Sequence, residues 1–329
     1  MTEQSGPKAD DAARIAAGYA TTGAALEFGA VVLDGAAYPQ AQVRVPLAMM
    51  NRHGLIAGAT GTGKTKTLQG LAEQLSAAGV PVVVADIKGD LSGLAAPGTS
   101  NDKITRRAAD TADTGWTPTA FPVEFLALGG IGTGVPVRAT MTGFGPTLLA
   151  KVLSLNDTQE SSLNLVFHYA DQHGLALLDL KDLRAVIAHL TSAEGKADLA
   201  ELGGLSAATA GVILRDLITL SDQGGDTFFG EPEFEPADLL RTGADGHGVI
   251  SAVELSGLQD RPQLFSTFLM WLLAELFENL PEVGDIDKPK LVFFFDEAHL
   301  LFTDASKAFL ERIEQTVKLI RSKGVGVFF

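Results

Sequence analysis

The sequence predicts an α/β fold in which a mostly parallel sheet carries helices on both faces. Residues 55–78 read as a short strand, a glycine-rich turn and a helix. Two further apolar runs, residues 82–85 and 291–295, each end in an aspartate. Because these runs lack alternation between apolar and polar residues, they are typical of parallel strands that are covered on both faces.

The glycine-rich turn has the spacing of a phosphate-binding loop. Gly58, Gly63, Lys64 and Thr65 fit the pattern G-x-x-x-x-G-K-[ST]. Glycines let the backbone N–H groups point at a phosphate, which also lies at the positive end of the following helix. The alternative, a turn that merely joins a strand to a helix, is disfavoured by this setting. The predicted nucleotide-binding residues are Gly58, Ala59, Thr60, Gly61, Thr62, Gly63, Lys64, Thr65 and Lys66.

The helix after this loop is predicted to run from about residue 64 to residue 78. One apolar face indicates that it packs on the sheet, and the following Gly-Val-Pro at residues 79–81 ends it. That face consists of Leu68, Leu71, Ala72 and Leu75.

An acidic pair, Asp296 and Glu297, follows the apolar run at residues 291–295. The carboxyl edge of a parallel sheet is where ligands bind, and we expect Asp296 to lie there beside the phosphate loop. Asp296 and the Thr65 hydroxyl are the predicted Mg²⁺ ligands, Asp296 through water, and Lys64 reaches the β- and γ-phosphates. Glu297 is predicted to activate or position the attacking water, so Lys64 and Glu297 are the predicted catalytic residues.

Three more polar residues leave the sheet after residue 85. Asp86, Lys88 and Asp90 are secondary site candidates, and a polar turn that simply exits the sheet explains them equally well. His299 completes an Asp-Glu-Ala-His string, which we interpret as a polar residue at the start of a loop or helix.

Composition excludes several classes of protein. With 25 Lys and Arg against 40 Asp and Glu, the net charge of -15 argues against coating nucleic acid through overall charge, although a local basic groove or pore is compatible with it. The absence of cysteine excludes disulfides, thiol chemistry and cysteine-based zinc sites, and the six histidines lack ligand spacing. No signal-peptide segment begins the chain, and the apolar stretch 264–277 is too short to span a membrane and contains Glu275. We therefore expect a cytoplasmic protein without a membrane span.

The chain is predicted to divide into a core and an insertion. Residues 1–46 form an N-terminal helix (residues 9–19) and a strand hairpin (residues 26–33 and 42–45), broken by Gly35 and Pro39. Residues 47–94 and 246–329 form the core, which includes a strand at 248–255, a helix at 261–279 and a helix that Gly324 ends. Because the chain stops within a predicted strand at Phe329, we expect a C-terminally truncated chain.

Residues 95–245 are predicted to be a mainly helical insertion with Gly/Pro/Thr-rich loops. A capping box at residues 157–160 opens one helix, which Gly174 closes, and Ser206 caps another that runs towards Asp222. Phe228 and Phe229 either meet a partner or pack under a loop, and packing is the commoner role for such a pair.

With these stretches in view, the sequence resembles the HerA/FtsK superfamily of P-loop ATPases, most closely the bacterial HerA-like proteins of the YjgR group. The resemblance covers nearly the whole chain, and the second and third of the matching segments point to the narrower group. The segments are residues 58–65, 86–94, 224–232, 291–299 and 320–327.

The resemblance implies a RecA-like core, a hexameric ring, ATP hydrolysis with Mg²⁺ and movement of double-stranded DNA. In such proteins a polar sensor, usually Gln, follows the strand that begins here at Val325, and it would lie beyond Phe329. The N-terminal region is shorter than the β-barrel of archaeal HerA proteins, so a shared partner such as a nuclease does not follow. Arg312 and Arg321 are candidate trans-acting arginines, with a solvated helix face as the alternative.

Three other function classes share these motifs. A protein-assembly or secretion ATPase has the same core, and a nucleotide-binding scaffold needs no turnover. A small-molecule kinase uses the same loop, but Glu297 beside Asp296 suits activation of water better than transfer to a hydroxyl.

Overall fold

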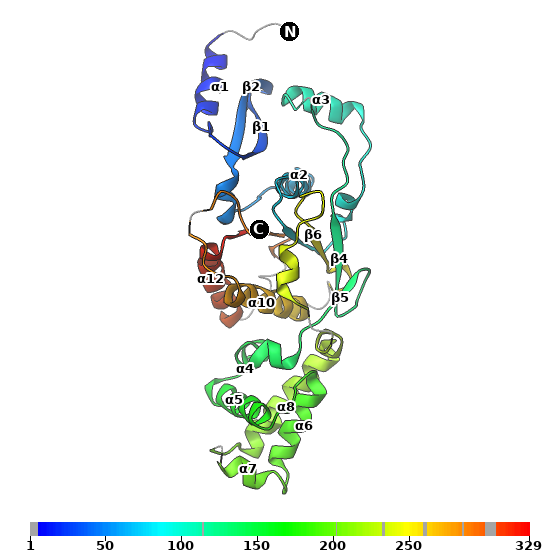
Figure 1. The fold of residues 1–329 in the computed structure, drawn as a ribbon, viewed down its shortest axis with the longest axis vertical. Coiled ribbons are helices and arrows are strands. Elements are labelled where there is room, and N and C mark those ends of the chain that lie inside the picture. Colours follow the sequence, from blue (N-terminus) through cyan, green and yellow to red (C-terminus); the bar gives the residue numbers. More distant parts are fainter. Residues whose placement is uncertain are drawn as a thin grey trace.

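The computed structural model describes residues 6–113, 115–201, 203–231, 234–258, 262–284, 286–299 and 307–329. The molecule is elongated, with a sheet in the middle, a strand hairpin towards one end and a helical segment at the other (Figure 1). Its helices are α1 (Pro7–Ala17), α2 (Lys64–Ala77), α3 (Asp102–Asp110), α4 (Met141–Val152), α5 (Asp157–Gln172), α6 (Leu180–Thr191), α7 (Lys196–Glu201), α8 (Ala207–Asp222), α9 (Gly225–Phe228), α10 (Pro262–Asn279) and α12 (Lys307–Ile320). Its strands are β1 (Ala25–Leu33), β2 (Ala36–Pro46), β3 (Val82–Asp86), β4 (Val123–Leu128), β5 (Val135–Val137), β6 (Ile250–Glu254), β7 (Leu291–Phe295) and β8 (Val325–Phe328).

The central sheet has six strands in the order β5-β4-β6-β3-β7-β8. Every neighbouring pair in it is parallel. This arrangement confirms the predicted α/β fold with a parallel sheet, and it brings the carboxyl ends of β3 and β7 side by side at one edge.

Helices cover both faces of this sheet, as the unbroken apolar runs predict. Val82 and Val84 belong to the core cluster that contains the buried face of α2. Val83 and Ala85 belong to the second cluster, which contains α10 and α12. Because successive side chains of a strand point to opposite faces, a run buried on both sides needs apolar residues at every position. All five residues of β3 and of β7 are buried accordingly.

The segment that leads into the phosphate loop differs from the predicted strand at residues 55–57. It forms only a parallel bridge between Gly54 and Phe328, at the outer side of β8. The Gly54 N–H donates to the Val327 carbonyl (3.0 Å) and the Ile56 N–H to the Phe329 carbonyl (2.7 Å). Leu55 is 76% exposed, so this segment lacks the second covered face that a buried strand requires.

Two strands of the sheet come from the range that the sequence assigns to the insertion. β4 pairs with β6, and β5 pairs with β4 at the edge of the sheet. β5 has only three residues, one of them Pro136, and a proline is tolerated in an edge strand because it lacks an N–H to donate. Its shortness and the flanking glycines hid it in the sequence. The division into domains stays a prediction, with the mainly helical part beginning at α4.

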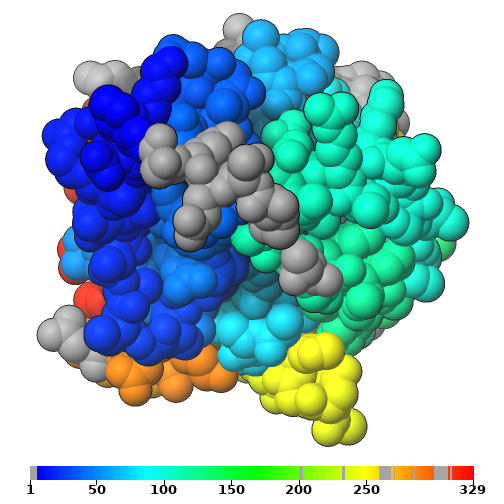
Figure 2. Space-filling model, turned by 90° about the horizontal axis from the view of Figure 1, so that it is seen from above, coloured from blue at the N-terminus to red at the C-terminus, as the bar shows by residue number. Residues whose placement is uncertain are grey.

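The N-terminal hairpin forms as predicted, with β1 and β2 antiparallel and α1 packed on them. Pro39 does not break β2, contrary to expectation, because a register shift between Ala30 and Val31 leaves it at an irregularity of the strand. The hairpin also contacts the segment around α3, since the Gln42 side chain donates to the Thr111 carbonyl (2.8 Å). Figure 2 shows the hairpin and the α3 segment next to each other at this end of the molecule.

The helical segment begins its elements with the polar caps that were expected, with one shift. Ser206 caps α8 by accepting from the Thr209 N–H. The capping box of α5 is formed by Asn156 and Gln159, one residue earlier than predicted from Asp157. Both Asn and Asp cap helices well, which explains how the sequence left the choice of register open.

Phe228 and Phe229 are buried, so they pack under a loop and do not face a partner. Phe228 stands edge-on to Phe144, with ring centroids 6.3 Å apart, and to Phe268 at 5.8 Å. Phe268 lies on α10, so this cluster joins the helical segment to the helices under the sheet.

Replacing one phenylalanine of this cluster with leucine is expected to lower the stability of the fold. Phe228→Leu leaves a cavity at a fully buried site and should lower the free energy of unfolding by about 1–2 kcal/mol. Thermal unfolding followed by circular dichroism measures the loss. The exposed Phe28→Leu is the matched control, and equal melting temperatures for the two variants would contradict the packing role.

Among the helices that the structure describes, none is both long and apolar enough to cross a lipid bilayer.

Candidate nucleotide-binding site

The glycines of the loop at residues 58–65 are required by its geometry. Gly63, the N-cap of α2, has φ 101° and Gly61 has φ 78°, which side chains rarely adopt. A Cβ on Gly58 would lie 2.5 Å from the Thr62 hydroxyl oxygen. The backbone therefore curls tightly onto the N-terminus of α2, an arrangement that favours binding of an anion.

The two lysines after Gly63 extend in different directions. Lys64 folds back over the loop, and its ammonium donates to the carbonyls of Gly58 (2.8 Å) and Ala59 (3.2 Å). Lys66 instead donates to the Gln69 side chain (2.7 Å). The Lys64 ammonium is thus placed over the loop where a bound phosphate would lie, and the Lys66 ammonium is held to the side. Thr65 is half-buried in the first turn of α2, and Thr60 is exposed.

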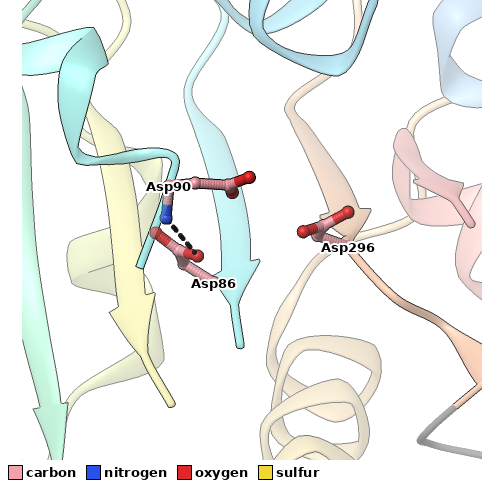
Figure 3. Close-up of side chains that lie close together, drawn as sticks. All are labelled: Asp86, Asp90 and Asp296. Carbon is pink, nitrogen blue, oxygen red and sulfur yellow. Dashed lines mark hydrogen bonds between the residues drawn. The ribbon is translucent and has the colours of Figure 1, made fainter. Parts of the chain in front are cut away.

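The acidic residues gather at the carboxyl edge of the sheet. Ala85 of β3 is the register partner of Phe295 of β7, so Asp86 and Asp296 follow at adjacent strand ends. Carboxylate oxygens of Asp86, Asp90 and Asp296 all lie within 4.8 Å of one another (Figure 3). The secondary candidates Asp86 and Asp90 therefore lie beside Asp296 at this edge of the sheet.

Asp296 has the surroundings of a cation ligand. It is 7% exposed, and its Oδ2 atom has no hydrogen-bond partner within the described part of the chain. Burial raises the pKa of Asp296, and the nearby charge of Asp90 raises it further. A buried carboxylate oxygen without a donor is costly, and a divalent cation or its bound water would satisfy it. The residues present therefore fit Mg²⁺.

Removing this charge is expected to stabilise the chain that carries no nucleotide. Because the folded-state pKa of Asp296 lies above its unfolded value, its contribution to stability is present at low pH and is lost as the pH rises through the folded pKa. Asp296→Asn should therefore raise the melting temperature at pH 7 by about 2 °C or more, with a smaller difference at pH 4. An unchanged or lower melting temperature at pH 7 would show that the buried charge of Asp296 does not destabilise the fold.

Glu297 has an uncommon backbone conformation, and its side chain contacts two neighbours. Its φ is 51°, in the left-handed region that non-glycine residues seldom adopt and that is concentrated at functional sites. Its carboxylate pairs with the Lys88 ammonium, and its Oε2 atom lies 3.2 Å from His299 Nδ1. The hydrogen bond from Lys88 lowers the pKa of Glu297, and the charges of Lys88, His299 and Lys64 act in the same direction. The charge of Lys64 makes the smallest of these contributions.

Lys88 is expected to keep Glu297 ionised at low pH. Its removal in Lys88→Met should raise the pKa of Glu297 towards the ordinary value, so the acid limb of the pH profile of kcat/KM for ATP should move to higher pH. Initial rates in short assays give the profile, with circular dichroism to exclude unfolding. Lys88→Arg keeps the charge and should restore the limb, whereas coincident profiles for wild type and Lys88→Met would contradict the role.

The position of Asp296 beside the loop needs one correction. β8 lies between β7 and the segment that leads into the loop, so the acidic pair is two positions away across the sheet. Among the candidate arginines, Arg321 is exposed after α12. The side chain of Arg312 lies outside the described residues.

Gln69 is a residue of the site that sequence reasoning missed. It is nearly buried (9% exposed), and its side-chain amide donates to the Asp90 carbonyl (3.1 Å). Thr65 and Gln69 are four residues apart and share one face of α2. The turn that carries Asp90 therefore lies against the face on which Thr65 stands. A polar residue within the apolar face, next to Leu68, was the available signal.

The sequence was compared with protein families and with curated proteins. Residues 32–329 match the family model described as Helicase HerA-like C-terminal. No curated protein matches the sequence.

Three solved structures are similar to the fold. The bacterial conjugative coupling protein TrwBdeltaN70, in its unbound monoclinic form, is 16% identical with a TM-score of 0.56 over 96% of this chain and 68% of that chain. Plasmid coupling protein TrwB in complex with ADP and Mg²⁺ is 16% identical with a TM-score of 0.57 over 96% and 69%. VirB4 of Thermoanaerobacter pseudethanolicus is 14% identical with a TM-score of 0.53 over 94% and 77%. These likenesses confirm the predicted RecA-like α/β fold.

Proposed function

The chain belongs to the Helicase HerA-like C-terminal family, and from that premise we propose that it is a Mg²⁺-dependent ATPase that works as a ring-forming motor on double-stranded DNA. The proposal rests on the hydrogen bond from Gln69 of α2, the helix that begins at the phosphate loop, to the Asp90 carbonyl at 3.1 Å. A carboxylate oxygen of Asp90 lies within 4.8 Å of one of Asp296, so the phosphate loop and the acidic edge, which are separated by some 230 residues in the sequence, form a single candidate site in this proposal.

Each residue then has a role that fits its surroundings. Lys64 exchanges the Gly58 and Ala59 carbonyls for phosphate oxygens. Thr65 and Asp296 would hold Mg²⁺, which would supply positive charge that stabilises the transferring phosphoryl group. Glu297, kept ionised by Lys88, accepts a proton from the attacking water or orients it.

Support for ATP and Mg²⁺ comes also from the solved structures. TrwB is described in complex with ADP and Mg²⁺, and this chain shares its fold over 96% of its own length. The proposal places the chain in the cytoplasm, where ATP and DNA are both at hand, and in a hexamer, in which Arg312 or Arg321 would reach a neighbour's nucleotide.

Hydrolysis in the presence of DNA tests the motor. Steady-state ATPase rates are measured with and without duplex DNA at low salt, where contacts with phosphates are strongest. We expect stimulation by DNA that fades as the salt concentration rises. An ATPase that is active but indifferent to duplex DNA at low salt would contradict the DNA motor.

The net charge bears on a second candidate, an ATPase that assembles or secretes protein. The charge of -15 weakens the DNA motor slightly and leaves this second class untouched. ATP hydrolysis without any response to DNA would support that class, and nucleotide binding without hydrolysis would support a scaffold.

A further inference from the structure

The three carboxylates at the sheet edge come from separate elements. Asp86 ends β3, Asp90 stands in the turn that follows it, and Asp296 follows the end of β7. Figure 3 shows the Asp90 and Asp296 side chains extending towards each other across the space between the two strands, with Asp86 below. Like charges this close repel each other unless a cation lies between them.

Asp86 has a structural task in this group. Its carboxylate accepts the backbone N–H groups of Gly89 (2.7 Å), Asp90 (3.3 Å) and Leu91 (3.0 Å). These bonds fold the turn back onto the end of β3 and fix the backbone from which Asp90 projects. The exposed side chain of Asp90 is thereby aimed at Asp296 while remaining open to solvent.

An independent observation points to a ligand at this place. Asp296 is more than nine-tenths buried, and its Oδ2 atom is without a partner in the part of the chain that the structure describes. An unsatisfied oxygen on a buried carboxylate is costly to maintain. The Asp296 side chain is directed into the space that it shares with Asp90 (Figure 3).

The same turn is attached to the phosphate helix. The Gln69 amide holds the Asp90 carbonyl at 3.1 Å, and Gln69 lies one helical turn after Thr65 on the same face of α2. The turn that carries Asp90 therefore lies on the same side of α2 as Thr65, where both residues could contact one cation.

We propose that Asp90 is a ligand of the divalent cation, and that Asp90 and Asp296, braced by Asp86, bind that cation before nucleotide arrives. Paired carboxylates are the oxygen donors that Mg²⁺ and Mn²⁺ prefer, and these ions keep several waters when held by one or two carboxylates. The remaining coordination positions stay open to phosphate oxygens. This inference rests on the proposed function and extends it, because the nucleotide-free chain would already bind the cation that ATP hydrolysis requires.

Binding of Mn²⁺ to the nucleotide-free chain tests the proposal. Electron paramagnetic resonance measures free Mn²⁺, whose signal disappears on binding, and competition with Mg²⁺ shows that the two ions share the site. We expect one Mn²⁺ per chain, and we expect Asp90→Asn to raise the Kd about tenfold or more. Asp296→Asn should do the same, whereas Asp222→Asn, which removes an exposed carboxylate at the end of α8, should leave the Kd unchanged.

Two results would overturn the proposal. One is a wild-type chain that binds Mn²⁺ no better than the Asp90→Asn variant. The other is a loss that is equal in the Asp222→Asn variant, which would indicate general attraction to an acidic surface. Because Asp90 is exposed, the variant should fold, and its circular dichroism spectrum checks this.

Failure of the proposed function is distinguishable from failure of this inference. The Mn²⁺ measurement uses no ATP, so a chain that binds Mn²⁺ through Asp90 but hydrolyses nothing keeps the cation site and loses the ATPase. If the Asp90→Asn variant hydrolyses ATP at the wild-type rate and binds Mn²⁺ with an unchanged Kd, the proposed ATPase stands and the role of Asp90 as a cation ligand is wrong.

Discussion

Replacing Lys64 with alanine is expected to lower ATP turnover by about 10³-fold or more and to weaken nucleotide binding. The Lys64 ammonium lies over the loop, where it donates to the carbonyls of Gly58 and Ala59, and these bonds would be exchanged for phosphate oxygens. Its loss removes the positive charge that offsets the charge developing on the phosphates, and removing one such donor alone costs about 10²–10³ in rate. Steady-state hydrolysis and binding of a fluorescent ATP analogue measure the two effects.

Lys181→Ala is the matched control for this experiment. It removes an exposed lysine from the first turn of α6, in the helical segment, and should leave both quantities unchanged. Nucleotide binding by Lys64→Ala as tight as that of the wild type, with full turnover, would show that the phosphates bind elsewhere.

The Glu297→Gln variant is expected to bind ATP but to hydrolyse it about 10²–10⁴-fold more slowly, the range found when a general base is lost. Glutamine has nearly the same size as glutamate and can still accept a hydrogen bond from Lys88, so the structure around residue 297 should stay intact. What is lost is the carboxylate that takes a proton from water. Single-turnover hydrolysis separates this step from binding, and Glu278→Gln, on the exposed side of α10, is the control. Turnover at the wild-type rate in Glu297→Gln would remove Glu297 from the mechanism.

The core of the fold was predictable because its strands are unambiguous. Residues 82–86 and 291–295 are apolar at every position, and only a strand covered on both faces buries such a run. α2 was equally clear, since its apolar face and the glycine at its start agree. In each case local propensity and burial point to the same structure.

The sheet edges were not predictable from the same signals. β5 has three residues around Pro136, and the segment before Gly58 pairs with β8 through one isolated bridge, with Leu55 exposed. Edge strands are short and weakly patterned because they bury less surface. Their pairing is decided by contacts distant in the chain, which a window of sequence does not contain.

The candidate site was predictable in its parts and not in its connections. The loop residues follow from spacing, and Asp296 follows from the end of a buried strand. The ion pair between Lys88 and Glu297 joins residues 209 positions apart, and the bond from Gln69 to Asp90 joins two elements, so neither leaves a mark in the sequence. The positive φ of Glu297 is likewise a product of the folded site.

A crystal structure with a non-hydrolysable ATP analogue and Mg²⁺ tests most directly whether the phosphate loop and the acidic edge form one site. We predict the triphosphate in the loop at residues 58–65, the γ-phosphate facing Glu297, and the cation between Thr65 and Asp296. A nucleotide seated away from that loop, or a γ-phosphate turned away from Glu297, would show that the loop and the acidic edge do not form one site.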